Sequence, residues 1–431
     1  MSALHISSGG GLEAMTTISI DQLCADAEAF LVGRLSRKPD RDAPFVWGEG
    51  SDSVSIVEDP DPEQEAVDLT AARKYAADRF DAGFGWIDGP VELGGRGLST
   101  EHKRAYASVE ARYRTPPMSF FTIGLGMVGP TVLVHGSDDV KAAYLRGIQR
   151  GDVLACQLFS EPGAGSDLAS VATRAERDGD EWVLDGQKVW TSNAHLSHIG
   201  EAICRTDPGQ PKHKGMTAFL VDMRAPGVEV RPLRQMNGGA GFNEVFLHEV
   251  RVPDSHRLGG VGEGWAVAMT TLMNERASLG GGMGLGPGPG PFERLPALLR
   301  AYGDTSDPVQ RQRIADLYVH QKVSEWTTRR ALARVQAGGL PGPEMSILKM
   351  AGTAQLHRIS DFVSGVLGPR LVADTGEWGT YAWADLVCGA PGARLGGGTD
   401  EVLRNIVGER VLGLPKEPGP DPGTPFRDLP R

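Results

Sequence analysis

Two segments near the middle of the chain combine residue types that could hold a planar, negatively charged ligand. The first, Cys156–Asp167 (CQLFSEPGAGSD), carries the hydroxyls of Ser160 and Ser166, and its small residues let backbone N–H groups approach a bound group closely. The second, Trp182–Asn193 (WVLDGQKVWTSN), has the Asp-Gly pair of a β-hairpin and presents Trp190, whose flat ring suits stacking on another ring. We therefore predict a site for a planar cofactor with an anionic tail.

Two further segments carry groups that could move a proton or meet a phosphate. Glu275 and Arg276 lie in a stretch otherwise rich in Met, Leu and Ala, where such a pair is ordinarily a solvated or mutually paired face of a helix. The turn Arg394–Glu401 (RLGGGTDE) opens a helix with Thr399 at the cap position. Its N–H donors could face a phosphate or ribose, or simply begin a well-capped helix. The residues alone leave both interpretations open.

Other patterns are predicted to carry no chemistry. The GLGPGPG stretch at 284–290 loses N–H donors at its prolines, so it is expected to be a helix-breaking loop. Ser346 and Lys349 have the SxxK spacing without its partner motifs. Three histidines lack an acid or thiolate at ligand spacing, and we predict surface residues and no metal site: His195, His198 and His213.

Composition limits the class of protein. The 431 residues carry a formal net charge of −11 with no compensating basic stripe, which speaks against a nucleic-acid partner. The 4 cysteines are far apart, as in a reducing compartment. No apolar run approaches the roughly 20 residues of a membrane span, and the N-terminus lacks an export signal. We expect a cytoplasmic protein.

The elements that must position these residues change character along the chain. Residues 19–152 have helical periodicity, residues 153–257 are short runs rich in Val, Trp, Phe and Thr, and residues 258–415 are helical again. We predict an α+β fold with an N-terminal helical domain, a central antiparallel β-barrel or sandwich, and a C-terminal domain like a four-helix bundle. Residues 1–18 and 416–431 are expected to be disordered.

Four motifs occur here in an order that resembles the acyl-CoA dehydrogenase family: CQLFSEPGAGSD, WVLDGQKVWTSN, FNEVFLHEVRVP and GGTDEVLRNIVGERVLGLP. The likeness covers about Ile20–Lys416 and includes the helical, β and helical order. It implies an enzyme of bacterial type that binds FAD non-covalently. A base removes the α proton of an acyl-CoA thioester, a hydride passes from the β carbon to flavin N5, and trans-2-enoyl-CoA results. The implied electron acceptor is an electron-transfer flavoprotein.

The resemblance also implies roles for individual residues. The pyrimidine side of the flavin is expected to meet backbone N–H groups and a hydroxyl in Gln157, Leu158, Phe159 and Ser160. The other side of the ring is expected to meet Trp190, Thr191 and Ser192. Phosphate contacts fall to Gly165 and Ser166, and the pyrophosphate and adenosine part to Thr399 and Glu401. The substrate is expected to contact Ser166, Arg276 and Gly398.

The residue that removes the proton departs from the commoner family pattern. Most members have a glutamate two residues before the position of Thr399, where this chain has Gly397, which cannot act as a base. A minority have it on a long helix immediately before an arginine, and Glu275 and Arg276 occupy those positions. The resemblance therefore implies Glu275 as the catalytic base, with Arg276 orienting it or the CoA arm.

Two family segments are not recognisable in this chain. The RxxFG segment, which contacts FAD across a subunit interface, has only a weak echo at 300–303, and SGVLGPRLVAD replaces the QxxGGxG segment. The resemblance implies a homo-oligomer, either a dimer or a tetramer. The altered segments put the usual FAD contacts across the interface in question and leave a hetero-oligomer as the alternative.

Two other functions stay open on the residues. A non-catalytic partner subunit of a hetero-oligomeric dehydrogenase is motivated by Gly397 and the altered interface segments. A flavin monooxygenase on the same fold needs no thioester base, and Glu275 speaks against it. The acyl group, whether straight, branched, aromatic or a steroid side chain, depends on pocket shape and is not readable from motifs.

Overall fold

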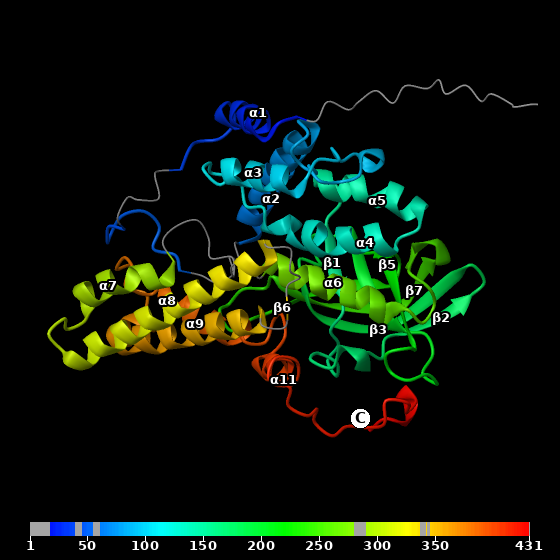
Figure 1. The fold of residues 1–431 in the computed structure, drawn as a ribbon. Coiled ribbons are helices and arrows are strands. Elements are labelled where there is room, and N and C mark those ends of the chain that lie inside the picture. The colour runs from blue at the N-terminus through cyan, green and yellow to red at the C-terminus, as the bar shows by residue number, and fades with distance from the viewer. Residues whose placement is uncertain are drawn as a thin grey trace, which may run out of the picture.

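The computed structural model describes residues 18–38, 45–54, 61–279, 290–336, 342 and 345–430. Helices precede and follow a central sheet (Figure 1), which confirms the predicted order of a helical, a β and a second helical region. The segment 1–18, predicted to be disordered, lies outside the described residues except for Ile18, as does all but the last residue of the predicted loop at 284–290.

Some of the N-terminal helices begin at a side chain that accepts hydrogen bonds from the first free N–H groups. Ser19 accepts from the N–H of Gln22. Asp61 accepts from the N–H groups of Glu63 and Gln64, which follow Pro62, a residue with no N–H of its own. The helices are α1 (Ile20–Val32), α2 (Pro62–Asp81), α3 (Thr100–Glu110), α4 (Gly129–His135) and α5 (Asp138–Arg150). A π-helical turn, Gly124–Val128, leads into α4.

The described strands form one mixed sheet that does not close on itself, which corrects the closed barrel and the purely antiparallel pairing of the prediction. They are β1 (Ala155–Leu158), β2 (Arg174–Asp178), β3 (Glu181–Ser192), β4 (Ile199–Arg205), β5 (Met216–Asp222), β6 (Val228–Leu233), β7 (Phe242–Pro253) and β8 (Arg257–Leu258). The order is β6-β7-β3-β2-β4-β5-β8, with β1 also on β4. Most pairs are antiparallel, but β1 and β2 both run parallel to β4 and share its edge.

The predicted hairpin within Trp182–Asn193 is wrong, because this segment is part of the single strand β3. The chain turns earlier, between β2 and β3, whose register pairs Asp178 with Glu181. The Asp-Gly pair instead marks a break in the register between β3 and β7. A Cβ on Gly186 would lie 2.5 Å from the hydroxyl of Thr173, so glycine there permits close strand packing.

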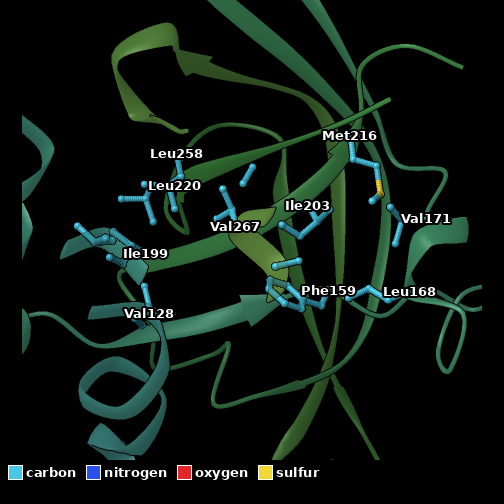
Figure 2. Packing of buried hydrophobic residues seen from close by; sticks show 14 of the residues in the cluster. Val128, Phe159, Leu168, Val171, Ile199, Ile203, Met216, Leu220, Leu258 and Val267 are labelled. Atoms are coloured by element: carbon cyan, nitrogen blue, oxygen red, sulfur yellow. The ribbon is translucent and has the colours of Figure 1, made fainter. Parts of the chain in front are cut away.

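The side chains of β4 alternate between two apolar clusters, which explains why this strand is buried on both faces. Ile199 and Ile203 pack with Val128 and with Val267 of the first C-terminal helix, as Figure 2 shows. Residues of the opposite parity, such as Cys204, belong to the second cluster. Strand β4 therefore faces the helical layer on one side and the second apolar cluster on the other.

The C-terminal helices gather around α9. They are α6 (Gly264–Leu279), α7 (Pro291–Tyr302), α8 (Pro308–Gln336), α9 (Met345–Leu367), α10 (Trp383–Ala393) and α11 (Asp400–Arg410). Helix α6 lies against the sheet, whereas α7, α8, α10 and α11 contact α9 (Figure 1). Leu298, Phe362 and Trp383 are buried between them. Within the described residues, no helix is long and apolar enough to cross a membrane.

Part of the C-terminal tail, which was predicted to be disordered, contacts the β unit, along which residues 416–430 run from α11 (Figure 1). Pro425 forms a bridge with Pro211, and the N–H of Phe426 donates to the carbonyl of Gln210 at 2.9 Å. The ring of Phe426 lies 3.9 Å from the guanidinium of Arg205. These contacts fix a segment whose composition is otherwise polar.

Candidate active site

The glycine-rich loop after β1, residues 159–167, is fixed by a buried ion pair. Lys188, which is fully buried on β3, donates to a carboxylate oxygen of Glu161 at 2.8 Å and to the carbonyls of Phe159 and Ile203. The same carboxylate accepts the N–H groups of residues 172 and 173. The loop is therefore joined to β3, β4 and the segment before β2.

The charge state of this pair follows from the balance of burial and its partners. Burial acts to raise the pKa of Glu161, but the Lys188 ammonium and the backbone donors outweigh it, so the pKa lies below the usual value. Glu161 is thus ionised at neutral pH and holds the loop in one conformation. Sequence reasoning missed Lys188, and the only signal was its inward position in the alternation of β3.

Trp190 is turned outward by an irregularity in the strand. The register between β3 and β7 shifts between Lys188 and Thr191, and Trp190 has a φ of 61°, which is rare for a residue with a side chain. Its ring is 58% exposed, with only one edge directed at Phe242. A strained, exposed aromatic face beside a fixed loop suits stacking on a planar ligand.

The other residues predicted around the ring contribute in different ways. Thr191 is buried, and its hydroxyl oxygen has no hydrogen-bond partner in the structure, which leaves a polar atom for a bound group. Leu158 and Phe159 direct their side chains into the two apolar clusters, so only their backbones can meet a ligand. Gln157 and Ser192 are half-buried.

The end of the loop is open to a larger ligand. Gly165 and Ser166 are exposed, and a Cβ on Gly165 would meet nothing within 4 Å. The neighbouring Asp167 accepts from the Lys212 ammonium at 2.7 Å. A planar group on Trp190 with an anionic tail along this open loop fits the residues present.

Glu275 of α6 and Gly397 of the turn before α11 come together from distant parts of the chain. A Cβ on Gly397 would lie 3.9 Å from a carboxylate oxygen of Glu275. Gly397 and Gly398 have φ values of 66° and 92°, which glycine adopts without strain. The half-buried carboxylate of Glu275 therefore lies beside the point at which a side chain at position 397 would start.

The turn itself is fixed by two basic residues. Arg394 donates to the buried carboxylate of Asp400 at 2.7 Å, and Lys349 donates to the carbonyl of Gly398 at 2.8 Å. Burial acts to raise the pKa of Asp400, but Arg394 outweighs it and the pKa is lowered. Thr399 caps α11 by accepting the N–H of residue 402. Sequence reasoning missed that Lys349 positions this turn.

The remaining predicted site residues lie as follows. Glu401 is exposed in the first turn of α11 and lies 3.5 Å from Arg404. Arg276 lies in α6, but its side chain is outside the described part of the structure. His195 is exposed, which agrees with the predicted surface histidine, and its imidazole lies 3.2 Å from a carboxylate oxygen of Glu65. Among the described residues, no cluster of His, Cys, Asp and Glu could hold a metal ion.

Comparisons with known proteins place these residues in context. Two family models match: "Acyl-CoA dehydrogenase, middle domain" over residues 156–250 and "Acyl-CoA dehydrogenase, C-terminal domain" over residues 262–412. Acyl-CoA dehydrogenase IpdE1 of Mycobacterium tuberculosis is 37% identical over 78% of this chain and 86% of the relative. Acyl-CoA dehydrogenase FadE34 of the same organism is 41% identical over 67% of this chain. The match covers only 39% of the length of FadE34.

Solved structures share the fold over nearly the whole length. A structure described as "Tcur3481-Tcur3483 steroid ACAD" has a TM-score of 0.69 and 29% identity over 92% of this chain and 98% of that chain. The ChsE4-ChsE5 complex from Mycobacterium tuberculosis gives a TM-score of 0.67 and 25% identity over 94% of this chain and 100% of that chain. Both segments of the site lie within the matched regions.

Proposed function

Since the chain belongs to the acyl-CoA dehydrogenase family, we propose that it oxidises an acyl-CoA thioester to the trans-2-enoyl-CoA with Glu275 as the base. Family membership also makes FAD its cofactor. The observation that carries the proposal is the 3.9 Å between a Cβ on Gly397 and the carboxylate of Glu275. A carboxylate from α6 thus lies where the commoner base of the family would extend from the turn.

In this proposal, cofactor binding and proton removal belong to two different regions of the chain. Bound FAD supplies the acceptor for the hydride that leaves the β carbon. Trp190 would hold its ring by stacking, while Ser160 and the Thr191 hydroxyl would offer hydrogen bonds. The open loop at Gly165 and Ser166 and the cap at Thr399 would bind phosphate oxygens.

The proposed base that removes the α proton lies on α6. Glu275 accepts the α proton at its carboxylate, and its half-buried position limits the water that competes for that proton. The left-handed turn at Gly397 and Gly398 brings backbone close to the carboxylate without placing a side chain over it. Lys349 and Arg394 keep that turn in place.

Anaerobic mixing of the FAD-loaded protein with acyl-CoA tests the proposal. We expect the visible absorbance of the flavin to fall with a suitable acyl-CoA, and the rate constant in Glu275→Gln to drop by about 10² or more, as for loss of a general base. Glu63→Gln, an exposed glutamate on α2, serves as the matched control and should keep the wild-type rate. A Glu275→Gln variant that holds FAD and is reduced at the wild-type rate contradicts this assignment of the base.

For the acyl group, we propose a steroid-derived side chain as the first class to test. The support is the likeness to the structure described as a steroid ACAD, with 29% identity over 98% of that chain. A panel of straight, branched, aromatic and steroid-side-chain acyl-CoAs compares the classes by rate constant and half-saturating concentration. Faster flavin reduction by a straight-chain acyl-CoA than by every steroid derivative contradicts the proposal.

We also propose that the chain works as part of an oligomer and passes its electrons to an electron-transfer flavoprotein. The support for assembly is an apolar stripe on α8: Val319, Val323 and Trp326 are 55%, 50% and 62% exposed at helical spacing. The occupant we propose is a second subunit of the same fold, since a solved relative is described as the complex of ChsE4 with ChsE5. Purification alone and with a candidate partner distinguishes a self-sufficient enzyme from a half-site subunit.

A further inference from the structure

A buried carboxyl group on β4 connects the sheet to the helix that carries Glu275. Glu201 is fully buried, and one of its carboxyl oxygens accepts the hydroxyl of Thr271 on α6 at 2.6 Å. The hydroxyl of Thr131 on α4 lies 2.9 Å from that of Thr271 and donates to the carbonyl of Met127 in the π-helical turn. These three side chains, which we call the Glu201 triad, join β4, α6 and α4.

The apolar surroundings of position 201 make the burial of an acidic side chain there costly in free energy. Its neighbours on the same face of β4, Ile199 and Ile203, belong to the apolar cluster of Figure 2. The second carboxyl oxygen of Glu201 has no hydrogen-bond partner in the structure. An apolar residue would fill this site without such a cost, so the acid must contribute something that apolar contact cannot, namely a bond with a direction.

The location of the triad indicates which parts of the site this directional hydrogen bond holds in place. Thr271 is the last described buried side chain of α6 before Glu275, which lies one helical turn further on the same face. On its other side, Glu201 is paired in register with Gln157 of β1, the strand that leads into the glycine-rich loop. The triad therefore lies between the predicted base and the predicted cofactor loop.

We propose that Glu201 is a positioning residue whose bond to Thr271 fixes α6 against β4 and β1 and so holds the Glu275 carboxylate in place beside Gly397. This inference rests on the proposed function of Glu275. Apolar burial has no preferred direction, whereas a hydrogen bond weakens steeply when its distance or angle departs from the optimum. Misplacement of a base by about 1 Å is enough to slow a reaction by about 10².

Protonation of Glu201 supplies a readout that packing alone would not affect. Burial raises the pKa of Glu201 to about 8, so it is neutral at pH 7 and becomes charged above that pKa. The described groups around it are uncharged: Gln157 of β1 and Leu220 of β5 are its partners in register, and Thr271 of α6 donates to it. Thr131 of α4 lies beyond, in contact with Thr271. Above about pH 8 a buried negative charge would therefore appear beside α6 with no cation to pair with it.

Anaerobic flavin reduction by acyl-CoA, followed from pH 6 to 9, tests the proposal in the FAD-loaded protein. Glu201→Gln keeps a neutral acceptor for Thr271, so we expect a rate constant within about threefold of wild type at pH 7, without the wild-type decline above about pH 8. Glu201→Leu and Thr271→Val remove the bond, and we expect rate constants lower by about tenfold or more with little change in half-saturating concentration. Ser360→Ala, which removes a buried hydroxyl from α9, is the control and should match wild type.

The outcomes separate this inference from the proposed function. If Thr271→Val and Glu201→Leu hold FAD and react at the wild-type rate, or if Glu201→Gln keeps the same alkaline decline, the positioning role is wrong. If Glu201→Leu fails to fold, Thr271→Val and the pH profile of Glu201→Gln decide. If wild type is not reduced by any acyl-CoA, or Glu275→Gln is as fast as wild type, the proposed function itself fails, whatever the Glu201 variants do.

Discussion

At the scale of single residues, Glu275 and Gly397 form a coupled pair. Because a Cβ at position 397 would lie 3.9 Å from the Glu275 carboxylate, a long acidic side chain at 397 would compete for the volume that this carboxylate fills. Two carboxylates in one such site would also repel each other and raise a pKa. The glycine at 397 is therefore what a base on α6 requires, and the absence of an acid from the turn does not by itself indicate an inactive subunit.

This coupling predicts that the catalytic carboxylate can be transferred from position 275 on α6 to position 397 in the turn. In a Glu275→Gly background, Gly397→Glu should restore flavin reduction by acyl-CoA by at least about tenfold over Glu275→Gly alone, because its carboxylate can enter the vacated volume. Recovery should be partial, since a side chain at a φ of 66° costs about 1 kcal/mol. Anaerobic rate constants measure it. Gly397→Gln in the same background is the control, and equal rates for the Glu and Gln variants would contradict the shared site.

Local motifs were enough to predict Trp190, Ser160 and Thr399 as site residues, because the chemistry proposed for them depends on residue type and immediate neighbours. Lys188 and Glu201 could not be found in this way, since each acts through burial and through partners on other strands and helices. A lysine or glutamate in a strand ordinarily indicates the exposed face, so alternation along the strand was too weak a signal to establish that these two face inward.

At the scale of elements, the tail after α11 shows how a polar segment can be ordered by one anchor. Phe426 covers the guanidinium of Arg205, which is itself buried and donates to the carbonyls of Ala169, Val171 and Lys212. Burial lowers the pKa of Arg205 to about 10, so it stays charged at neutral pH and keeps its partners. The tail, the glycine-rich loop region and the β4–β5 connection therefore meet at one side chain.

Phe426→Ala should loosen this junction. We expect a loss of about 1–2 kcal/mol in the free energy of unfolding, from the cation–π contact and the covered apolar area together. Urea unfolding gives the free energy, and limited proteolysis should cut faster within 207–214. Arg427→Ala, an exposed neighbour in the same turn, is the control. An unchanged proteolysis rate and unfolding midpoint in Phe426→Ala would mean that the tail is not held by this contact.

The element order was predictable, whereas the tail and the sheet form were not. Periodicity and composition are local properties, and they separated helical from β regions correctly because each stretch is long. The tail has few apolar residues, so composition predicted disorder, and nothing near Phe426 in the sequence shows that a distant arginine lies beneath its ring. Likewise, the Asp-Gly pair of β3 predicted a turn because a bulge and a hairpin use the same residues.

At the scale of the whole molecule, the surface of α8 is incomplete in a single chain. Val319, Val323 and Trp326 recur at positions i, i+4 and i+7, so they form one face, and each is at least 50% exposed. Elsewhere on α8, Leu317 is buried and packs toward α9, so the helix has one covered face and one apolar uncovered face. Covering such a stripe is a usual reason for subunits to associate, and the area grows if Tyr318 is included.

A charge placed in this stripe should therefore break the assembly without disturbing the fold. We expect Val323→Glu to shift the sedimentation coefficient to that of a smaller species, because a carboxylate would be buried at the interface without a partner. Val67→Glu, at a residue 63% exposed on α2, is the matched control and should sediment like wild type. Since Glu275 and Trp190 lie in the same chain, the dissociated Val323→Glu protein should still be reduced by acyl-CoA if it keeps FAD. Loss of FAD on dissociation would instead show that the cofactor site is completed by the second subunit, while an unchanged sedimentation coefficient would contradict the role of the stripe in assembly.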